Sequence, residues 1–236
     1  MISIIIPVIN EADTIVSLLE YISKNSSLKN ISEIIIVDGG SQDKTRQIVD
    51  LYAKKSIANI RLISSEKGRA RQMNTGARSA TGTILYFLHA DSFPPNNFDE
   101  SIISEIQRGE IAGCFRMRFD NNHPLLKFSQ WFTRFNIKLF RGGDQSLFIS
   151  NELFDQMNGY DEQYLIYEDC EFISRLYKKH GFTIIPDYIL TSARKYDQIG
   201  TWKLQYHFAV IHLKNSLGVS AEKLYQYYER SVTSKK

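Results

Sequence analysis

Polar and charged side chains gather at four points of this sequence, each directly after a short β-branched run. Carboxylates at neighbouring strand ends repel one another unless a cation or a ligand rich in donors lies between them. Open α/β sheets bind their ligands at the carboxyl ends of the strands, where these clusters would meet. The pattern predicts a site for such a ligand at one edge of a sheet. The clusters are residues 7–11, 38–43, 66–71 and 89–91.

Each cluster has a simpler structural explanation when it is taken alone. Glu11 would suit the start of a helix, where the dipole favours an acid, and Asp38 followed by two glycines would suit a tight turn. Four polar clusters at the same edge make coincidence a poor explanation for the set.

The residues in these clusters resemble the motifs of the family 2 glycosyltransferases, which have the GT-A fold. Four matching segments follow the family's order and end at Asp91, and a fifth ends at Asp169. Each segment is a weak signal alone, whereas the ordered set is specific. The segments are Ile-Ile-Pro7-Val-Ile-Asn10-Glu11, Ile-Val-Asp38-Gly-Gly-Ser41-Gln-Asp43-Lys-Thr45, Gly68-Arg-Ala-Arg71-Gln-Met-Asn74-Thr-Gly76-Ala, Phe87-Leu-His89-Ala-Asp91 and Tyr167-Glu168-Asp169.

The resemblance implies an inverting, hexosyltransferase-like enzyme that moves a sugar from a nucleoside diphosphate, expected to be UDP, to an acceptor hydroxyl. Glu11 and Asp38 would accept hydrogen bonds from the base and the ribose. Arg71 and Asn74 would line the pocket near the diphosphate. The nucleotide-sugar site implied in this way comprises Pro7, Asn10, Glu11, Asp38, Gly40, Arg71, Asn74, Ala90, Asp91 and Arg194.

A divalent cation, Mg²⁺ or Mn²⁺, is implied at Asp91, because this residue ends the segment where the family has its Asp-x-Asp motif. Such cations take oxygen ligands, usually one or two carboxylates together with substrate phosphates. This sequence departs from the motif, since His89 stands in place of the first Asp. His89 would be a second metal ligand or a donor to the diphosphate, and a ring packed at a strand end is the alternative.

Asp169 is the first choice for the general base that inversion requires, and Glu168 is the second. The alternative is that both are acids placed in the first turn of a helix by its dipole. On the acceptor side, the resemblance points to three further residues in a segment that would also fit a plain tight turn. They are Gly143, Asp144 and Gln145.

Arg194 and Lys195 form a pair of adjacent cations after a predicted strand. The guanidinium fork of Arg194 is suited to a diphosphate, over which it would close when the donor binds. Solvated surface charge is the alternative explanation for the pair.

The elements that must position these side chains alternate between strand and helix in the first half of the chain, which predicts a mostly parallel sheet with helices on both faces. The second half is less regular. Strands are expected at 2–7, 33–37, 60–64, 83–88, 111–119 and 182–186. Helices are expected at 12–24, from a cap at Ser41 or Asp43 to about 55, and at 69–80, 98–107, 125–140, 151–157, 168–180, 201–217 and 221–230.

We therefore expect an α/β protein of the GT-A type with C-terminal helices, forming one domain over residues 1–236. Its nucleotide-sugar-binding half would cover about 1–95, its acceptor half about 96–198, and its C-terminal helices about 199–230.

Aromatic residues form an apolar stripe between Leu125 and Arg141, with Lys127, Arg134 and Lys138 around it. Such a helix suits a membrane interface, which would agree with a lipid-linked acceptor, but an amphipathic helix packed on a core has the same pattern. His207 and His212 fall on different faces of one predicted helix, so they are interpreted as structural.

Composition narrows the remaining alternatives. The net charge of +3 argues against a nucleic-acid partner, and two cysteines cannot build a disulfide framework. No run of about 18 apolar residues is present, and residues 1–7 lack the basic start of a signal peptide. The expected location is the cytoplasm, with peripheral contact at the inner face of the membrane as an extension. The alternative function is a non-catalytic nucleotide-sugar sensor on the same fold.

Overall fold

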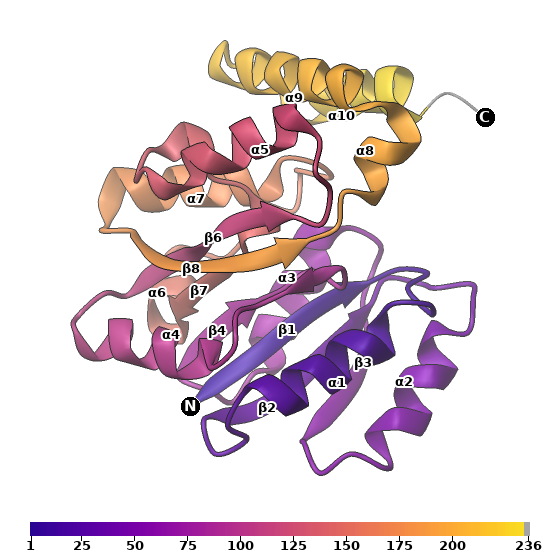
Figure 1. The fold of residues 1–236 in the computed structure, drawn as a ribbon, viewed down its shortest axis with the longest axis vertical. Helices are drawn as coiled ribbons and strands as arrows, with labels where there is room; N and C mark the ends of the chain where they lie inside the picture. Colours follow the sequence, from indigo (N-terminus) through magenta and orange to yellow (C-terminus); the bar gives the residue numbers. More distant parts are fainter. Residues whose placement is uncertain (234–236) are drawn as a thin grey trace.

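The computed structural model describes residues 1–233. One eight-stranded sheet runs through the molecule, with helices on both faces (Figure 1). The strands are β1 (Ile2–Val8), β2 (Ile31–Asp38), β3 (Ile60–Ser64), β4 (Ile84–Phe87), β5 (Ser92–Phe93), β6 (Ala112–Phe119), β7 (Leu147–Ser150) and β8 (Thr183–Thr191). The α-helices are α1 (Ile15–Asn25), α2 (Thr45–Ala53), α3 (Arg69–Ser79), α4 (Phe98–Gln107), α5 (Pro124–Trp131), α6 (Asn151–Gln156), α7 (Glu168–Lys179), α8 (Arg194–Ile199), α9 (Thr201–Ser216) and α10 (Ala221–Tyr228).

The sheet separates two apolar cores, because successive side chains of a strand point to opposite faces. On β1, Ile4 and Ile6 join the core beneath α1 and α4, whereas Ile5 joins the core beneath α3, α6 and α7. In the first half of the fold, β1 and β4 are fully buried strands, and α1 buries a single apolar stripe.

The strand order is β3-β2-β1-β4-β7-β6-β8-β5. Strands β1 to β4 pair in parallel, as predicted, and so do β6 and β8. Strand β7 runs antiparallel to both β4 and β6, and β5 runs antiparallel to β8, so the sheet is mixed in its second half. The predicted α/β architecture with C-terminal helices is confirmed.

The predicted helix over 125–140 is wrong beyond Trp131. Two short 3₁₀ turns follow α5, η1 (Phe132–Arg134) and η2 (Lys138–Phe140). The chain bends here around the buried guanidinium of Arg141, which donates to the backbone oxygens of Thr133 and Phe135, both at 2.7 Å. Neither Gly nor Pro marks this break, which explains why helical periodicity alone missed it.

Two elements near the sheet edge were not predicted. Strand β5 has only two residues and pairs with β8. Helix α8 begins at Arg194, in a segment where no helix was expected. Its start is held by the carboxylate of Asp120, which accepts from the Ala193 N–H at 2.7 Å. Helices α9 and α10 lie together at the end of the molecule away from β3 (Figure 1).

Candidate active site

The loops after β1 and β2 are tied together at the carboxyl edge of the sheet. The backbone N–H of Asn10 donates to Ser41 Oγ at 2.9 Å, and Asn10 Oδ1 accepts from the Gln42 N–H at 2.8 Å. The N–H of Glu11 donates to Thr45 Oγ1 at 2.9 Å. Asn10 takes a left-handed conformation with φ of 54°, which Asn tolerates better than most residues. These bonds fix the edge on which the predicted nucleotide-sugar residues lie.

Asp38 is fully buried at the end of β2 and is held by its own loop. Its carboxylate accepts from the N–H groups of Gly40 and Ser41, each at 3.2 Å, and from Arg46 Nη1 at 3.1 Å. Burial alone would raise the pKa of Asp38, but these bonds outweigh it and lower the pKa. Asp38 is therefore a fixed anion at neutral pH.

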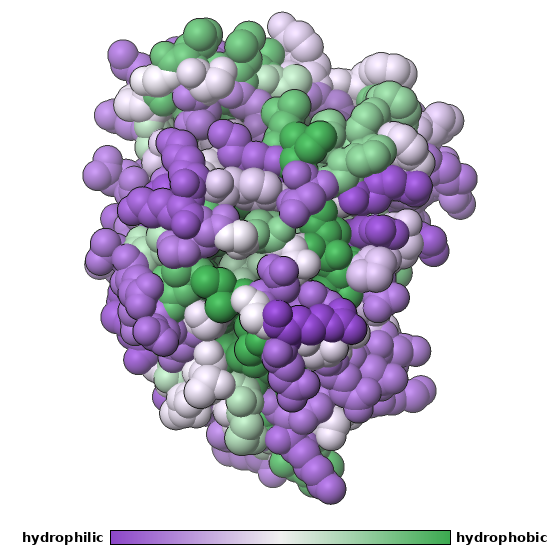
Figure 2. All heavy atoms as spheres, turned by 90° about the vertical axis from the view of Figure 1, so that its left-hand side faces the viewer, coloured by the Kyte–Doolittle hydropathy of each residue, from purple (hydrophilic) through white to green (hydrophobic). Residues whose placement is uncertain are grey.

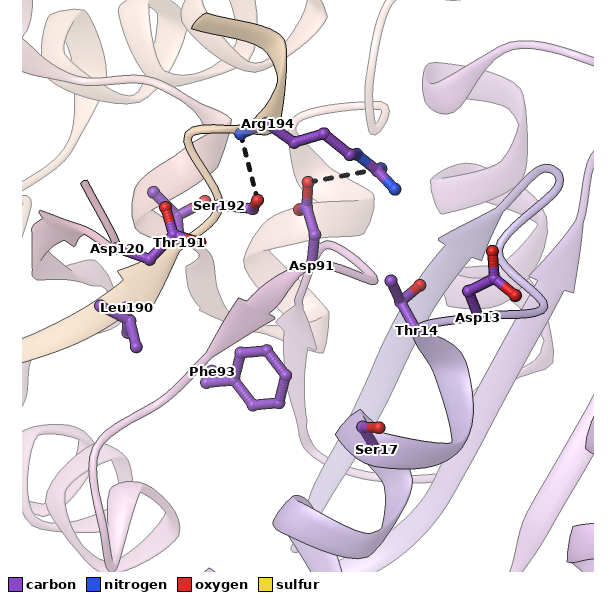
Figure 3. Close-up of a pocket in the computed structure, with 10 residues that line it drawn as sticks. All are labelled: Asp13, Thr14, Ser17, Asp91, Phe93, Asp120, Leu190, Thr191, Ser192 and Arg194. Atoms are coloured by element: carbon purple, nitrogen blue, oxygen red, sulfur yellow. Dashed lines mark hydrogen bonds and ion pairs between the residues drawn. The ribbon is translucent and has the colours of Figure 1, made fainter. Parts of the chain in front are cut away.

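Arg194 joins the segment after β8 to the loops after β1 and β4 at this edge. Its Nη2 lies 3.3 Å from Glu11 Oε1 and 4.0 Å from Asp91 Oδ2, so one guanidinium contacts two carboxylates. Figure 3 shows Arg194 and Asp91 pointing toward each other beside a pocket of about 270 Å³. Thr14 at the N-cap of α1, Ser17 of α1 and Phe93 of β5 also line this pocket.

Glu168 and Asp169 begin α7, and both are almost completely buried. The preceding residue, Tyr167, has a left-handed φ of 70°, a strained conformation for a residue with a large side chain. Its hydroxyl lies 2.8 Å from Nδ1 of His212 on α9. Burial lowers the pKa of His212, so its neutral ring can accept the Tyr167 hydroxyl. Helix α9 thus holds the turn that presents the two carboxylates.

His89 lies between two carboxylates of the predicted acceptor half. Its Nδ1 is 3.6 Å from Asp144 Oδ1, and its Nε2 is 3.7 Å from Asp169 Oδ2. Burial opposes charging of the ring, but the two carboxylates outweigh it and raise the pKa of His89 to about 10. As an imidazolium, the ring donates toward both carboxylates in this arrangement, and the role of His89 as a metal ligand stays a prediction.

Arg69 at the start of α3 is a site residue that sequence reasoning missed. Its Nη1 lies 3.2 Å from Glu168 Oε1, and the other oxygen of Glu168 is buried with no hydrogen-bond partner among residues 1–233. Burial raises the pKa of Glu168, with Asp169 adding to the rise and Arg69 opposing it. Arg69 falls inside the Gly68-Arg-Ala-Arg71 segment, but nothing in that segment indicates which arginine faces α7.

The glycine turn after η2 packs directly on Asp169. A Cβ on Gly143 would stand 1.9 Å from Asp169 Oδ2 and 2.8 Å from His89 Cε1, so no larger residue fits without moving the loop. Asp144 is exposed and contacts His89, in agreement with an acceptor-side position. Gln145 is instead buried, bound to Arg141 and to the Phe140 carbonyl, so it supports the loop rather than facing an acceptor.

Two residues predicted to lie near the diphosphate bind other side chains and backbone groups of the protein in this structure. Asn74 is buried, and its amide binds the backbone of Tyr160 and the carboxylate of Glu162. Arg71 pairs with Glu66 and lies 3.9 Å from Glu162. Both therefore contact the segment after α6, and their place in the nucleotide pocket stays a prediction.

The remaining predicted residues keep to the edge of the sheet. Pro7 lies in β1 opposite Val37, Gly40 follows β2 with φ of 96°, and Ala90 is buried between His89 and Asp91.

Asp91 is the residue here that fits a divalent cation. Burial raises the pKa of Asp91, with the carboxylates of Asp144 and Glu11 adding to the rise and the cations of His89 and Arg194 opposing it. Within residues 1–233, no three His, Cys, Asp or Glu side chains converge in a way that would hold a metal by themselves. One carboxylate completed by ligand phosphates is the arrangement common for Mg²⁺. Asp91 therefore fits as such a carboxylate.

Comparison with known proteins gives the same family as the sequence motifs. The model of glycosyl transferase family 2 matches residues 3–165. Glycosyltransferase AglE of Haloferax volcanii is 33% identical over 107 residues, which are 44% of this chain and 35% of AglE. A PGL/p-HBAD biosynthesis glycosyltransferase of Mycobacterium bovis is 27% identical over 212 residues, covering 85% of this chain and 78% of the relative. This chain thus spans about a third of AglE and more than three quarters of the mycobacterial protein.

Solved structures share the fold at low sequence identity. The mannosyltransferase PcManGT from Pyrobaculum calidifontis, in complex with GDP-Man and Mn²⁺, has a TM-score of 0.70 at 18% identity and covers 100% of this chain and 65% of its own. Staphylococcus aureus TarS residues 1–349 in complex with UDP have a TM-score of 0.68 at 19% identity, covering 81% of this chain and 60% of that one.

Proposed function

Because this chain belongs to glycosyl transferase family 2 and is a glycosyltransferase, we propose that it transfers a sugar from a nucleoside diphosphate to an acceptor hydroxyl with inversion. The observation that carries the proposal is that the proposed base and the proposed donor site are close neighbours, linked through His89, Asp91 and Arg194. Asp169 contacts His89, Asp91 follows two residues later, and Arg194 joins Asp91 to Glu11.

In the proposed reaction, Asp169 accepts the proton of the acceptor hydroxyl. The acceptor oxygen then bonds to the anomeric carbon, and the bond from that carbon to the diphosphate oxygen breaks on the opposite face. Asp169 is preferred to Glu168 because Glu168 is committed to Arg69 at 3.2 Å, whereas Asp169 faces His89 and the glycine turn. His89, as an imidazolium, keeps Asp169 oriented and offsets part of the charge it shares with Asp144.

On the donor side, Arg194 is proposed to exchange its carboxylate partners for the diphosphate, which its fork can bind at two points. Glu11 and Asp38 are proposed to bind the nucleoside, with Asn10 shaping the loop between them. A divalent cation on Asp91 would supply Lewis acid stabilisation of the leaving nucleoside diphosphate when bound. UDP is the proposed nucleotide, in keeping with the motif resemblance.

The acceptor is proposed to be lipid-linked. One relative, from Methanococcus voltae and 34% identical over 109 residues, is named dolichyl N-acetyl-alpha-D-glucosaminyl phosphate 3-beta-D-2,3-diacetamido-2,3-dideoxy-beta-D-glucuronosyltransferase, so the acceptor in its name is a lipid-linked sugar phosphate. That likeness covers 45% of this chain and 34% of the relative, and it supports the class of acceptor rather than its identity.

Thermal unfolding with UDP, GDP, CDP and ADP, each with and without Mn²⁺, tests the donor half of the proposal. A ligand at 100 times its Kd adds about 2.7 kcal/mol, or roughly 5–11 °C for a domain of this size. We expect UDP to give such a shift with Mn²⁺ and Asp91→Asn to remove the dependence on the metal. No shift with any of the four nucleotides would contradict the donor site.

The base is tested by Asp169→Asn, with Asp187→Asn on the exposed part of β8 as the matched control. Loss of a general base typically costs between about 10² and 10⁴ in rate, so turnover should fall by that factor while the UDP-induced shift stays. Wild-type turnover in Asp169→Asn would contradict the assignment. Nucleotide binding without turnover in the wild type would favour the sensor alternative.

A further inference from the structure

Helix α9 is apolar on two sides, although only one of them packs against the body of the protein. Leu204 and Ile211 are the buried residues of α9 and form its packed side. On the other side, a stripe at spacings of 4, 11 and 15 residues leaves large side chains in solvent. The stripe consists of Trp202 (71% exposed), Tyr206 (65%), Leu213 (60%) and Leu217 (74%). A helix that is apolar all round is normally covered on every side, so this stripe requires a partner.

A second group of exposed apolar side chains lies on α5 and on the segment 132–140 that follows it. Its members are Phe128, Trp131, Phe135, Ile137 and Leu139. Trp131 packs edge-on against Phe135, with ring centroids 4.9 Å apart, so part of this group is an ordered aromatic cluster. The break of the predicted helix after Trp131 therefore leaves these side chains exposed rather than burying them on a core.

The two groups belong to one region of the surface, because α5 packs against α9. Figure 1 shows α5 directly beneath α9 at the end of the molecule opposite β3. Figure 2 shows apolar side chains at the top of the side that it presents, where these helices lie, with hydrophilic side chains over much of the lower part. We name this region, formed by α5, η1, η2 and α9, the distal surface.

Charge on the distal surface has one sign. Residues 121–143 and 198–221 contain no Asp or Glu, although the chain has 26 of them. The same two segments carry exposed cations beside the apolar side chains, namely Lys127, Arg134, Lys138 and Lys203. The guanidinium of Arg134 stacks over Trp131, 4.7 Å from the ring centroid. Aromatic side chains mixed with cations and without acids complement an anionic headgroup layer above hydrocarbon.

We propose that the distal surface docks the enzyme onto an anionic lipid bilayer, with its aromatic side chains in the interface and its cations on the headgroups. This goes beyond sugar transfer and does not depend on it. None of the helices within residues 1–233 has both the length and the apolar character needed to cross a bilayer. The contact is therefore peripheral. A second copy of the chain is a poorer occupant, because its own distal surface would bring like charges together.

Co-sedimentation of the full chain with vesicles tests the proposal. Vesicles of phosphatidylcholine alone are compared with vesicles of equal parts phosphatidylcholine and phosphatidylglycerol, at low and at high salt. We expect binding to the anionic vesicles that weakens with salt. Absence of binding to anionic vesicles at low salt would overturn the proposal.

Variants then locate the contact. Trp131→Ser with Trp202→Ser should reduce binding by roughly tenfold for each side chain that the interface buries. Lys127→Gln, Arg134→Gln and Lys138→Gln should each reduce binding to anionic vesicles by about fivefold and leave binding to neutral vesicles unchanged. The matched control is Ile57→Ser, because Ile57 is 91% exposed but lies between α2 and β3, away from the distal surface.

Equal losses in the control and the tryptophan variant would overturn the assignment of the surface. So would a wild-type dimer in sedimentation velocity that the tryptophan variant converts to a monomer without any change in vesicle binding. The UDP-induced thermal shift is measured on the same variants, so failure of docking and failure of donor binding are separated.

Discussion

Asp38 and Asp169 are buried carboxylates of the same candidate site, but they are held in different ways. The hydrogen-bond partners of the Asp38 carboxylate all come from the eight residues that follow it, and two of them are backbone N–H groups. Asp169 lies against His89 and Gly143, and its neighbour Glu168 pairs with Arg69 across 99 residues. The donor side is thus built by local loop geometry, whereas the acceptor side exists only after distant elements have packed.

The same contrast appears in proton affinity. In the first half, hydrogen bonds outweigh burial and lower the pKa values of Glu33 and Asp38. At the start of α7, burial and the neighbouring Asp169 raise the pKa of Glu168 despite Arg69. Glu33 and Asp38 therefore stabilise the fold at neutral pH, while Glu168 is kept in a less favourable charged state. Variants in the two regions should accordingly separate stability from turnover.

The largest effect is expected from Glu33→Gln, which should lower stability without affecting catalysis. Glu33 is 2% exposed and accepts from Ser3 Oγ, from Arg61 and from both the N–H and the hydroxyl of Thr81. Removing the charge from this cluster should cost about 3 kcal/mol, or roughly 6–12 °C in Tm. Glu33 lies near the amino end of β2, so turnover below Tm should remain that of the wild type.

This loss should depend on pH in a defined direction. Because the folded pKa of Glu33 is lowered, its contribution is complete above the unfolded value of about 4.3 and disappears as the pH falls through the folded value. The Tm gap between wild type and variant should close below about pH 4. Glu105→Gln, which breaks an exposed pair with Arg108, is the control and should change Tm little at any pH. A constant gap down to pH 3 would contradict the charge argument.

Gly143→Ala should produce the largest effect on turnover in this comparison. Its Cβ would meet Asp169 Oδ2 at 1.9 Å, so either the loop or the proposed base must move. Misplacement by about 1 Å costs on the order of a hundredfold in rate. The neighbouring Gly142→Ala is the control, because the nearest atom to its Cβ is Cys170 Sγ at 4.0 Å. Wild-type kcat in Gly143→Ala, measured with Tm for both variants, would show that this turn does not cover Asp169 during reaction.

His212→Phe should have the smallest effect. It keeps a ring against Tyr167 but removes the acceptor of the Tyr167 hydroxyl, so the strained turn before Glu168 loses one support. We expect kcat to fall by less than tenfold and donor KM to stay constant, with a loss of about 1 kcal/mol in stability. His207→Phe removes a matching bond to Tyr227 on α10, and its kcat should not change. An equal fall in both would contradict a specific link through Tyr167.

The first half of the fold could be predicted closely from the sequence. Its strands are continuous apolar runs, its helices carry single stripes, and Asp38 is held by residues that directly follow it. Strand β3 and helix α4 have the predicted bounds.

Prediction failed where side chains from distant segments decide the structure. The break after Trp131 follows from Arg141, strand β5 from pairing with β8, and α8 from Asp120. At the site, the motifs selected Asp169, Asp91 and Glu11, which the structure brings to one edge. They could not indicate that His89 sits between two carboxylates, that Arg69 holds Glu168, or that Asn74 and Arg71 serve the segment after α6.

The pairing of Arg69 with Glu168 has a consequence for the order of folding. Closing a contact over 99 residues costs more chain entropy than closing the loop that holds Asp38, and contacts distant in sequence form slowly. During synthesis, β1 to β3 and their loops leave the ribosome long before α7. A growing chain can thus contain the loops proposed to bind the nucleoside while it still lacks the proposed base, so catalytic competence arises only after α7 has been synthesised and packed.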